Sequence, residues 1–499
     1  MAGKPNIIFV MPDQLRADFL SCYDASFIDT PNIDALADHG VIYGNAYSAH
    51  PVCVPARVSL MTGMNAIKTG VLDNGAFLRP DYRDCGLATW PEILSENGYY
   101  TVGIGKMHFF PWEIALGFQH RIIAEDKVWI HIRDDYDAFL RAHGYEKNMG
   151  HERADYQENY GAFLTDLPWE YSVDHFVGQE ATRWIEGYQG DEPFAMMVGF
   201  PGPHPPYDPA PEFAREFDDA DIPAPVPEVA EDMHVFRGKR PKSKKRLWWR
   251  SQKEGDPDQE TYMLHRRYYA ALVKQIDYEM GCILDALRER GMLDNTIILF
   301  SSDHGDYLGD HDLSGKNSFF EAATHVPLLV RLPKAEGTTV CHDLVTLTDI
   351  TATMLHFSGC VVPQQMEGDS IPLPALGIDV ERPRDRVVGA LTRSWMYLDG
   401  EWKLCKYASG GALLYNLRQD PTEQHNLARD GRYQEVFHDL DDRLTSEIMA
   451  SIAMAHYEKR VYARVPYPST STEVGERGWR RRYPQRVGDV LAKLRSERG

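Results

Sequence analysis

Four short apolar segments, each followed directly by charged or amide side chains, constrain the fold more than any other feature of this 499-residue chain. The segments are 6–11, 99–104, 194–200 and 296–300. They alternate with amphipathic helical stretches, which is the pattern of parallel strands joined by crossover helices. We therefore predict an α/β fold with a large, mostly parallel sheet covered by helices on both faces.

The side chains that follow these segments are of the kinds that bind metal ions or anions and transfer protons. They are Asp13 and Gln14, Lys106 and His108, His204, and Asp303 and His304. Ligands of open α/β sheets bind beyond the carboxyl ends of the strands. We therefore expect these residues to converge on one site at that edge of the sheet.

The pattern changes beyond about residue 374, where short strand-like runs replace the alternation of strands and helices. Asp399-Gly400 separates the runs 394–398 and 402–406, which is typical of a β-hairpin. We therefore predict a large α/β domain over 1–375 and a smaller α+β domain over 376–499. The smaller domain is expected to contain an antiparallel sheet, a helix and a basic tail.

Two polar segments leave alternatives open. Segment 218–250 passes from acidic and proline-rich to basic and is interpreted as a surface excursion, either a solvated loop or a basic lid that attracts anions. The tail between 477 and 486 is rich in arginine and aromatic residues. It is either an arm that packs on a second copy in a homo-oligomer or a frayed end.

Charge and hydropathy exclude several classes of partner. The formal net charge is −21, from 74 acidic and 53 basic residues, so nucleic acid and anionic membrane surfaces are poor partners. No window approaches the roughly eighteen apolar residues of a membrane span, and the N-terminus lacks a signal-peptide layout. The expected location is therefore the cytoplasm. The seven cysteines are scattered without a C-x-x-C pair, which favours neither a disulfide framework nor a thiolate zinc site.

Cys53 differs from the other cysteines in its surroundings. The string Cys53-Val54-Pro55-Ala56-Arg57 is expected to form a turn before a helical segment at 58–61. The Cys53 side chain would then lie near a helix N-terminus, where anions are favoured. Read alone, the string also fits a buried or mildly activated thiol.

This string, together with Ser-x-Met-Thr-Gly at 59–63, resembles the signature of the type I sulfatases of the alkaline phosphatase superfamily. Other ordered strings match the same family over nearly the whole chain. They lie at 30–37, 105–108, 203–207, 302–306, 315–316, 414–417, 420–421 and 426–428. The resemblance implies an alkaline phosphatase-like sheet sandwiched by helices, with 1–375 as the catalytic domain.

The resemblance further implies that a maturase oxidises Cys53 to Cα-formylglycine, whose hydrate is the nucleophile. One hydroxyl would attack sulfur, and the second would expel sulfate by restoring the aldehyde, which an ordinary Ser or Cys cannot do. The implied activity is hydrolysis of anionic sulfate monoesters to an alcohol or phenol and inorganic sulfate. The resemblance is to sulfuric ester hydrolases of the arylsulfatase-like kind.

The resemblance also implies a bound divalent cation, with ligands at Asp13, Gln14, residue 53, Asp303 and His304. Many sulfatases carry a second Asp where this chain has Gln14, and many carry Asn where it has His304. Gln in place of Asp removes a negative charge, and imidazole tolerates softer metals. Ca²⁺ is therefore the first expectation and Mn²⁺ the second.

The remaining site residues are also carried over from the family. Lys106 and Lys316 would hold sulfuryl oxygens, and Lys316 or His204 would protonate the leaving oxygen. His108 would act as the base in sulfate release, and Arg57 would hold the hydrate with its fork of donors. Asn74 would reach a substrate oxygen, although Asp-Asn-Gly is also a plain turn sequence.

The alternative enzyme is a phosphonate monoester hydrolase or phosphodiesterase of the same superfamily, which shares the formylglycine and both ligand pairs. Those relatives tend to carry Tyr-x-Thr where this chain has Lys106-Met107-His108, which favours sulfate here. A binding protein that retains the fold is disfavoured, because the cysteine and the metal carboxylates are present. The alcohol part stays open between aryl, choline and sugar. Aromatic residues that follow the motifs are Phe77, Phe109, Phe110, Trp112 and Tyr207.

Overall fold

The computed structural model describes residues 4–80, 82–83, 87–229, 257–366, 368–380 and 382–455. The basic part of the segment 218–250 and the basic tail lie outside these residues. The acidic part, up to residue 229, runs without regular secondary structure from residue 220 onward. The proposed roles of the excursion and the tail therefore stay predictions.

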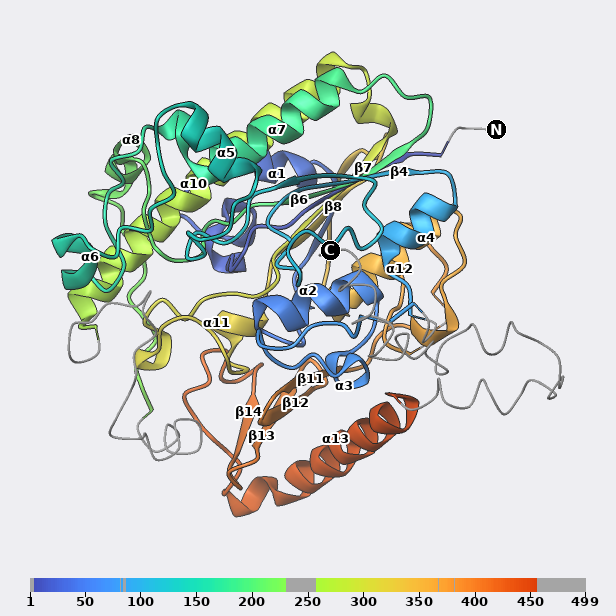
Figure 1. Cartoon of the computed structure of the whole chain (residues 1–499). Helices are drawn as coiled ribbons and strands as arrows, with labels where there is room; N and C mark the ends of the chain where they lie inside the picture. The colour runs from blue at the N-terminus through green and yellow to red at the C-terminus, as the bar shows by residue number, and fades with distance from the viewer. Residues whose placement is uncertain are drawn as a thin grey trace, which may run out of the picture.

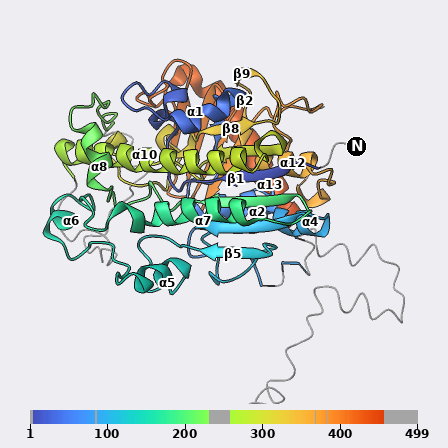
Figure 2. The same cartoon turned by 90° about the horizontal axis from the view of Figure 1, so that it is seen from above.

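An eight-stranded sheet forms the centre of the molecule, in the order β5-β4-β6-β1-β7-β8-β2-β9. Figure 2 shows β9, β2, β8, β1 and β5 following one another across this sheet. The strands are β1 (Asn6–Val10), β2 (His39–Tyr43), β4 (Tyr100–Gly105), β5 (His120–Ile123), β6 (Phe194–Gly199), β7 (Thr296–Ser301), β8 (Leu328–Arg331) and β9 (Gly337–Cys341). Strand β8 runs antiparallel to both of its neighbours, and all other pairs in this sheet are parallel. The predicted mostly parallel sheet is confirmed, and its four predicted strands are β1, β4, β6 and β7.

Helices cover both faces of this sheet (Figure 1). One face carries α1 (Pro31–Ala37), α7 (Val173–Gly187) and α10 (Gln259–Glu289), and the other carries α2 (Cys53–Thr62), α4 (Trp90–Glu96) and α12 (Leu347–Phe357). Side chains alternate along β1, so that Ile8 and Val10 pack in the first core and Ile7 and Phe9 in the second. Two apolar cores thus hold the carboxyl ends of the central strands at one edge. No helix within the described residues is long and apolar enough to cross a membrane.

A separate antiparallel sheet lies below the main sheet in Figure 1, beside α13 (Gln434–Ala455). Its strands, in spatial order, are β11 (Val387–Leu391), β12 (Ser394–Leu398), β13 (Trp402–Tyr407) and β14 (Ala412–Asn416). Gly400, at φ +92°, turns the hairpin between β12 and β13 where Asp399-Gly400 predicts it. The predicted small α+β unit is confirmed, whereas the boundary at residue 375 stays a prediction.

The remaining elements are short and connect the two sheets to the helical layers. They are α3 (Ala66–Thr69), α5 (Asp135–Ala142), α6 (Ala154–Glu158), α8 (Pro211–Ala214), α11 (Glu321–Thr324), β3 (Ala46–Tyr47) and β10 (Val345–Thr346). Strands β3 and β10 pair in parallel and place the chain that leads into α2 beside the start of α12.

Candidate active site

Cys53 is the first residue of α2, and its side chain is buried. The helix therefore begins earlier than the sequence predicts, since a turn was expected up to Arg57. Pro55 does not delay it, because the N–H groups of a first helical turn have no intrahelical acceptor. The Asn74 side-chain oxygen accepts a hydrogen bond from the Val54 N–H at 3.0 Å. Asn74 thus caps the helix that presents Cys53.

Four buried residues bring potential metal ligands to one point. Asp13, Cys53, Asp303 and His304 each offer one ligand atom, and these atoms lie within 4.8 Å of one another. The His304 Nε2 is 3.3 Å from the Cys53 Sγ, and the Asp13 Oδ1 is 3.9 Å from it. Asp13 follows β1 and Asp303 follows β7, which are paired in parallel, so the sheet itself brings them together.

This donor set suits a divalent cation. Two carboxylates and one imidazole supply hard oxygen ligands and one nitrogen, and residue 53 would add an oxygen if it were oxidised. The cluster is buried and holds two carboxylates close together, so a cation between them would relieve their mutual repulsion. The residues present therefore fit the metal that the sequence predicts.

Arg57 lies one helical turn after Cys53 and uses its donors on the same carboxylates. Its Nε is 2.9 Å from the Asp303 Oδ2, and its Nη2 is 3.0 Å from the Asp13 Oδ2. Its Nη1 donates to the Lys106 carbonyl at 2.8 Å. Burial lowers the pKa of Arg57, but the charges of Asp303 and Asp13 outweigh this and raise it above the usual range. Arg57 therefore stays charged and fixes both carboxylates.

Asp126 connects two further predicted residues and was not itself predicted from the sequence. Its Oδ2 is 2.7 Å from the Lys106 Nζ, and its Oδ1 is 3.6 Å from the His204 Nδ1. The Lys106 Nζ is also 2.8 Å from the Asp13 Oδ2. Asp126 follows β5, which is the same strand-end signal as for the other site residues. That signal is weak here because β5 is short, half-buried and carries His120 and Arg121.

Asp306 plays a similar part for Gln14. The Gln14 Nε2 donates to the Asp306 Oδ2, and the Gln14 Oε1 accepts from the Lys316 Nζ. The Tyr207 hydroxyl donates to the same Asp306 oxygen at 2.7 Å. The Gln14 backbone N–H also donates to the Asp303 Oδ1 at 3.0 Å. This bond links Gln14 to the four clustered ligand residues Asp13, Cys53, Asp303 and His304, which we call the donor cluster. Gln14 and Lys316 thus lie at the site. Tyr207 is buried and holds Asp306, the residue that binds the Gln14 amide.

His108 lies at a left-handed backbone position, with φ +58°. Its backbone N–H donates to the Glu125 Oε2 at 3.0 Å, so Glu125 fixes the turn two residues after Lys106. Its Nδ1 is buried and has no hydrogen-bond partner among the described residues. Of the aromatic residues singled out in the sequence, Phe109 is buried, whereas Phe110 is 74% exposed.

The pKa values of the two carboxylates in the donor cluster are shifted in opposite directions. Burial raises the pKa of both, but for Asp13 the charges of Lys106, His204, Arg57 and Lys316 outweigh burial and hold its pKa well below the usual range. The pKa of Asp303 is raised by burial and by the charge of Asp13 beside it. A divalent cation would relieve this repulsion.

The same charges act on residue 53. Burial and Asp13 raise the pKa of the Cys53 thiol, but Lys316, His304 and Lys106 outweigh them and lower it well below the usual range. The environment therefore stabilises negative charge at residue 53. This is the requirement for an oxygen nucleophile at that position as well.

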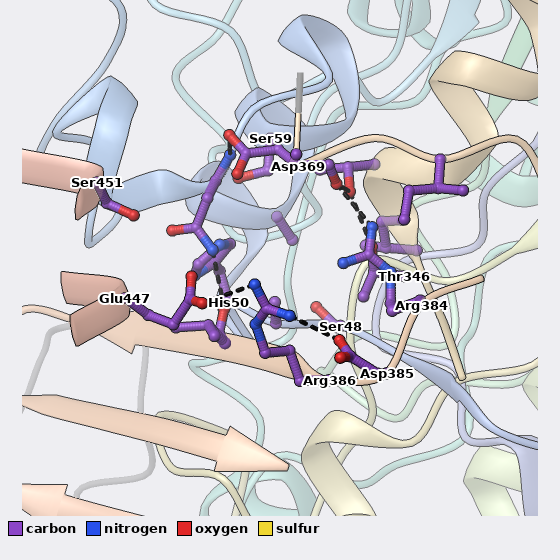
Figure 3. A pocket seen from close by; sticks show the side chains of 18 of the residues that line it. Ser48, His50, Ser59, Thr346, Asp369, Arg384, Asp385, Arg386, Glu447 and Ser451 are labelled. Carbon is purple, nitrogen blue, oxygen red and sulfur yellow. Dashed lines mark hydrogen bonds and ion pairs between the residues drawn. The ribbon is translucent and has the colours of Figure 1, made fainter. Parts of the chain in front are cut away.

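A cavity of about 380 Å³ lies elsewhere (Figure 3). It is bounded by α2 at Ser59, by Arg384 and Arg386, and by α13 at Glu447. The Ser59 hydroxyl is buried and has no hydrogen-bond partner within the described residues. None of the four clustered ligand residues is among those that line this cavity, so it is separate from the candidate active site.

Comparison with known proteins places this geometry in a family. The sulfatase family matches residues 5–360, and the C-terminal part of N-sulphoglucosamine sulphohydrolase matches residues 309–450. An arylsulfatase of Clostridium perfringens is 28% identical over 473 residues, which cover 89% of this chain and 94% of that protein. A choline-sulfatase of Rhizobium meliloti is 30% identical over 453 residues, which cover 86% of this chain and 83% of that protein.

Solved structures share the fold. The phosphonate monoester hydrolase of Agrobacterium radiobacter superposes with a TM-score of 0.74 at 23% identity, covering 90% of this chain and 96% of that chain. A structure in complex with its substrate D-glucosamine-2-N,6-O-disulfate superposes with a TM-score of 0.68 at 21% identity, covering 90% and 98%. Because the family match covers well over half of the sequence, the chain belongs to the sulfatase family and is an enzyme of the sulfuric ester hydrolase class.

Proposed function

We propose that this enzyme hydrolyses sulfate monoesters with a formylglycine formed from Cys53 and a divalent cation held at the same point. The observation that carries the proposal is the convergence of the Asp13, Cys53, Asp303 and His304 ligand atoms within 4.8 Å. Cys53 lies in an intact Cys-x-Pro-x-Arg string at the N-terminus of a buried helix. A group of potential metal ligands that contains this cysteine supports its role as the nucleophile position.

The cation would be held by Asp13, Gln14, Asp303 and His304, together with an oxygen of residue 53. Such an ion would polarise the sulfuryl group and lower the pKa of the attacking hydroxyl. Formylglycine supplies a hydrated aldehyde, with one hydroxyl for attack and a second for release of sulfate. Ca²⁺ is the first candidate ion and Mn²⁺ the second. Conversion of Cys53 requires a maturase as a partner during biosynthesis.

Lys106 and Lys316 provide positive charge on two sides of the donor cluster. Lys106 is completely buried against Asp13, and Lys316 contacts the Gln14 oxygen. Both ammonium groups can therefore bind sulfuryl oxygens at the metal site. Arg57 holds the carboxylates Asp13 and Asp303, and through them the position of residue 53.

Protonation of the leaving oxygen is assigned to Lys316 instead of His204. Burial lowers the pKa of His204 to about 4, although Asp126 opposes the shift. Its Nδ1 is 2.7 Å from the Pro205 carbonyl, which can only accept a hydrogen bond. At neutral pH the ring then carries one proton, and that proton is held by Pro205. Lys316 has a transferable proton in contact with the site.

His108 is the proposed base for sulfate release. Its ring nitrogen Nδ1 is free of hydrogen bonds within the described part of the chain, and Glu125 fixes its backbone. Asn74 is proposed to contact a substrate oxygen with its amide nitrogen, because its oxygen already caps α2 at Val54.

Phosphonate monoester hydrolysis is the second candidate, since such a hydrolase shares the fold at a TM-score of 0.74. Lys106 and His108 favour sulfate, because relatives that hydrolyse phosphonate monoesters or phosphodiesters tend to carry Tyr-x-Thr where this chain has Lys106-Met107-His108. Hydrolysis of para-nitrophenyl sulfate should be compared with that of the matched phosphonate and phosphodiester esters. We expect a higher kcat/KM for the sulfate; a clear preference for the phosphorus esters would overturn the proposal. Choline and sugar sulfates in the same panel identify the alcohol part.

A further inference from the structure

Asp126 is a buried carboxylate that contacts the sulfuryl-binding side of the site without belonging to the metal group. Its side chain lies 2.7 Å from the Lys106 Nζ and 3.6 Å from the His204 Nδ1. The Val128 N–H holds its Oδ1 at 3.1 Å. Burial raises the pKa of Asp126, but His204 and Lys106 outweigh it and hold the pKa below the usual range. Asp126 is therefore ionised at neutral pH.

The charged side chains of the donor cluster, together with those linked to it directly or through Lys106 or Gln14, nearly cancel in net charge. Among the described residues the cations are Arg57, Lys106 and Lys316, and the carboxylates are Asp13, Asp126, Asp303 and Asp306. Four carboxylates exceed three cations by one. With the hydrate of residue 53 uncharged, as it is before attack, a divalent cation would therefore leave these side chains with a single net positive charge.

A single positive charge matches the substrate better than the product. A sulfate monoester carries one negative charge, whereas inorganic sulfate carries two. Without Asp126 the same site would carry two positive charges and would match the dianion. The negative charge on Asp126 is thus placed to weaken binding of the product relative to the ester.

We propose that Asp126 sets the charge selectivity of this site, so that singly charged esters bind and doubly charged sulfate is released. The proposal rests on the sulfatase function proposed above. Asp126 acts through Lys106, so it is a positioning and charge-balancing residue. Glu125, its neighbour, contacts the backbone N–H of His108 instead of an ammonium group and serves as the matched control.

The test measures equilibrium binding of two anions to the mature, metal-loaded enzyme by calorimetry. The probes are inorganic sulfate, with two charges, and ethanesulfonate, with one charge and no ester to hydrolyse. Asp126→Asn removes the charge but keeps an oxygen for Lys106. We expect this variant to strengthen the binding of sulfate relative to that of ethanesulfonate by about tenfold or more, because loss of one nearby negative charge favours the dianion over the monoanion.

The controls separate charge from position. Asp126→Glu should keep the wild-type ratio of the two dissociation constants, and Glu125→Gln should keep it as well. The inhibition constant for sulfate during turnover should fall in Asp126→Asn by the same factor as its dissociation constant. An unchanged ratio in Asp126→Asn, or an equal shift in Glu125→Gln, would overturn the inference.

Failure of the inference differs from failure of the proposed function. If Asp126 has no such role, the wild-type enzyme still hydrolyses sulfate esters and sulfate still inhibits it, with one binding ratio in all variants. If the sulfatase proposal is wrong, the wild-type enzyme hydrolyses no sulfate ester in the panel. That result would also remove the basis of the inference.

Discussion

Two buried clusters of charged side chains in this enzyme have different architectures. At the carboxyl edge of the main sheet, Asp13 and Asp303 face Cys53 and His304 around one point. Between α11 and β13, Lys403 lies 2.7 Å from the Glu321 Oε1 and 2.5 Å from the Glu423 Oε1. In this second cluster, the Lys403 triad, the lysine lies between its two acceptors.

The difference shows how a functional cluster is distinguished from a structural one. Both clusters are buried and both shift the pKa values of their members. Of the two, the first directs several potential ligand atoms to a shared point, which is where we propose that a cation and a substrate bind. The Lys403 triad instead connects the catalytic sheet region to the C-terminal sheet. Burial of charge alone therefore does not identify a site.

The largest expected effect is at Asp303. Asp303→Ala removes a charged ligand and the partner of Arg57, so we expect loss of bound metal and about a thousandfold loss of turnover. Gln14→Ala should cost less, because water can replace a neutral amide. Metal content and para-nitrophenyl sulfate turnover of both variants decide the matter, with circular dichroism as the control for folding. Equal metal and activity in Asp303→Ala would show that the cluster is not functional.

A substitution at Lys403 tests whether the Lys403 triad stabilises the fold without contributing to the active site. Lys403→Met leaves the buried Glu423 and the half-buried Glu321 without a cation, which should lower the free energy of unfolding by about 3–5 kcal/mol. The folded enzyme should keep its metal and its turnover per folded molecule. Urea unfolding and metal analysis measure both quantities. Loss of metal from the folded variant would mean that the triad belongs to the site.

Much of this arrangement is predictable because strand ends are readable in the sequence. The apolar runs that form β1, β4, β6 and β7 are each followed by a polar site residue, and the parallel-strand rule alone places Asp13, Lys106, His204 and Asp303 at one edge. The opposite direction of β8 is not predictable, since its apolar run looks like that of a parallel strand.

Residues that act through other residues are harder to predict. Asp306 receives Gln14 and Tyr207 only because the loop up to Gly315 folds back onto it, with the Gly315 N–H 3.1 Å from the Asp306 Oδ1. Asp126 follows a strand with polar residues that is not an apolar run. Such contacts depend on tertiary packing, which a local pattern does not record.

A substitution at Lys106 tests why the site would prefer sulfate esters to phosphorus esters. Lys106→Ala should reduce the sulfate reaction about tenfold more than the matched phosphorus reactions, because the proposed preference for sulfate is attributed to the ammonium group at this position. Steady-state kinetics on the matched para-nitrophenyl esters measure the ratio. A uniform loss across all esters would mean that Lys106 only stabilises Asp13. Lys316→Ala in the same assay shows whether the selectivity is specific to Lys106.

The smallest expected effect is a pH dependence in the Lys403 triad. Burial and the charge of Glu321 raise the pKa of Glu423 to about 7, against the opposing effect of Lys403. Ionising Glu423 in the folded state therefore costs stability, and the enzyme should lose at least about 1 kcal/mol as pH rises from about 4.5 to about 7. Glu423→Gln should lack this loss. Thermal unfolding of both proteins across this range measures it, and parallel pH profiles would contradict the assignment.

Conversion of Cys53 to formylglycine, which we propose as the nucleophile, is the step on which the proposed reaction depends. Mass spectrometry of the peptide containing residue 53, from fully active enzyme produced aerobically with the maturase, tests it most directly. We predict that the mass of this peptide corresponds to formylglycine at position 53 and that turnover rises in proportion to the converted fraction. Fully active enzyme that contains only the unmodified Cys53 thiol would contradict the account.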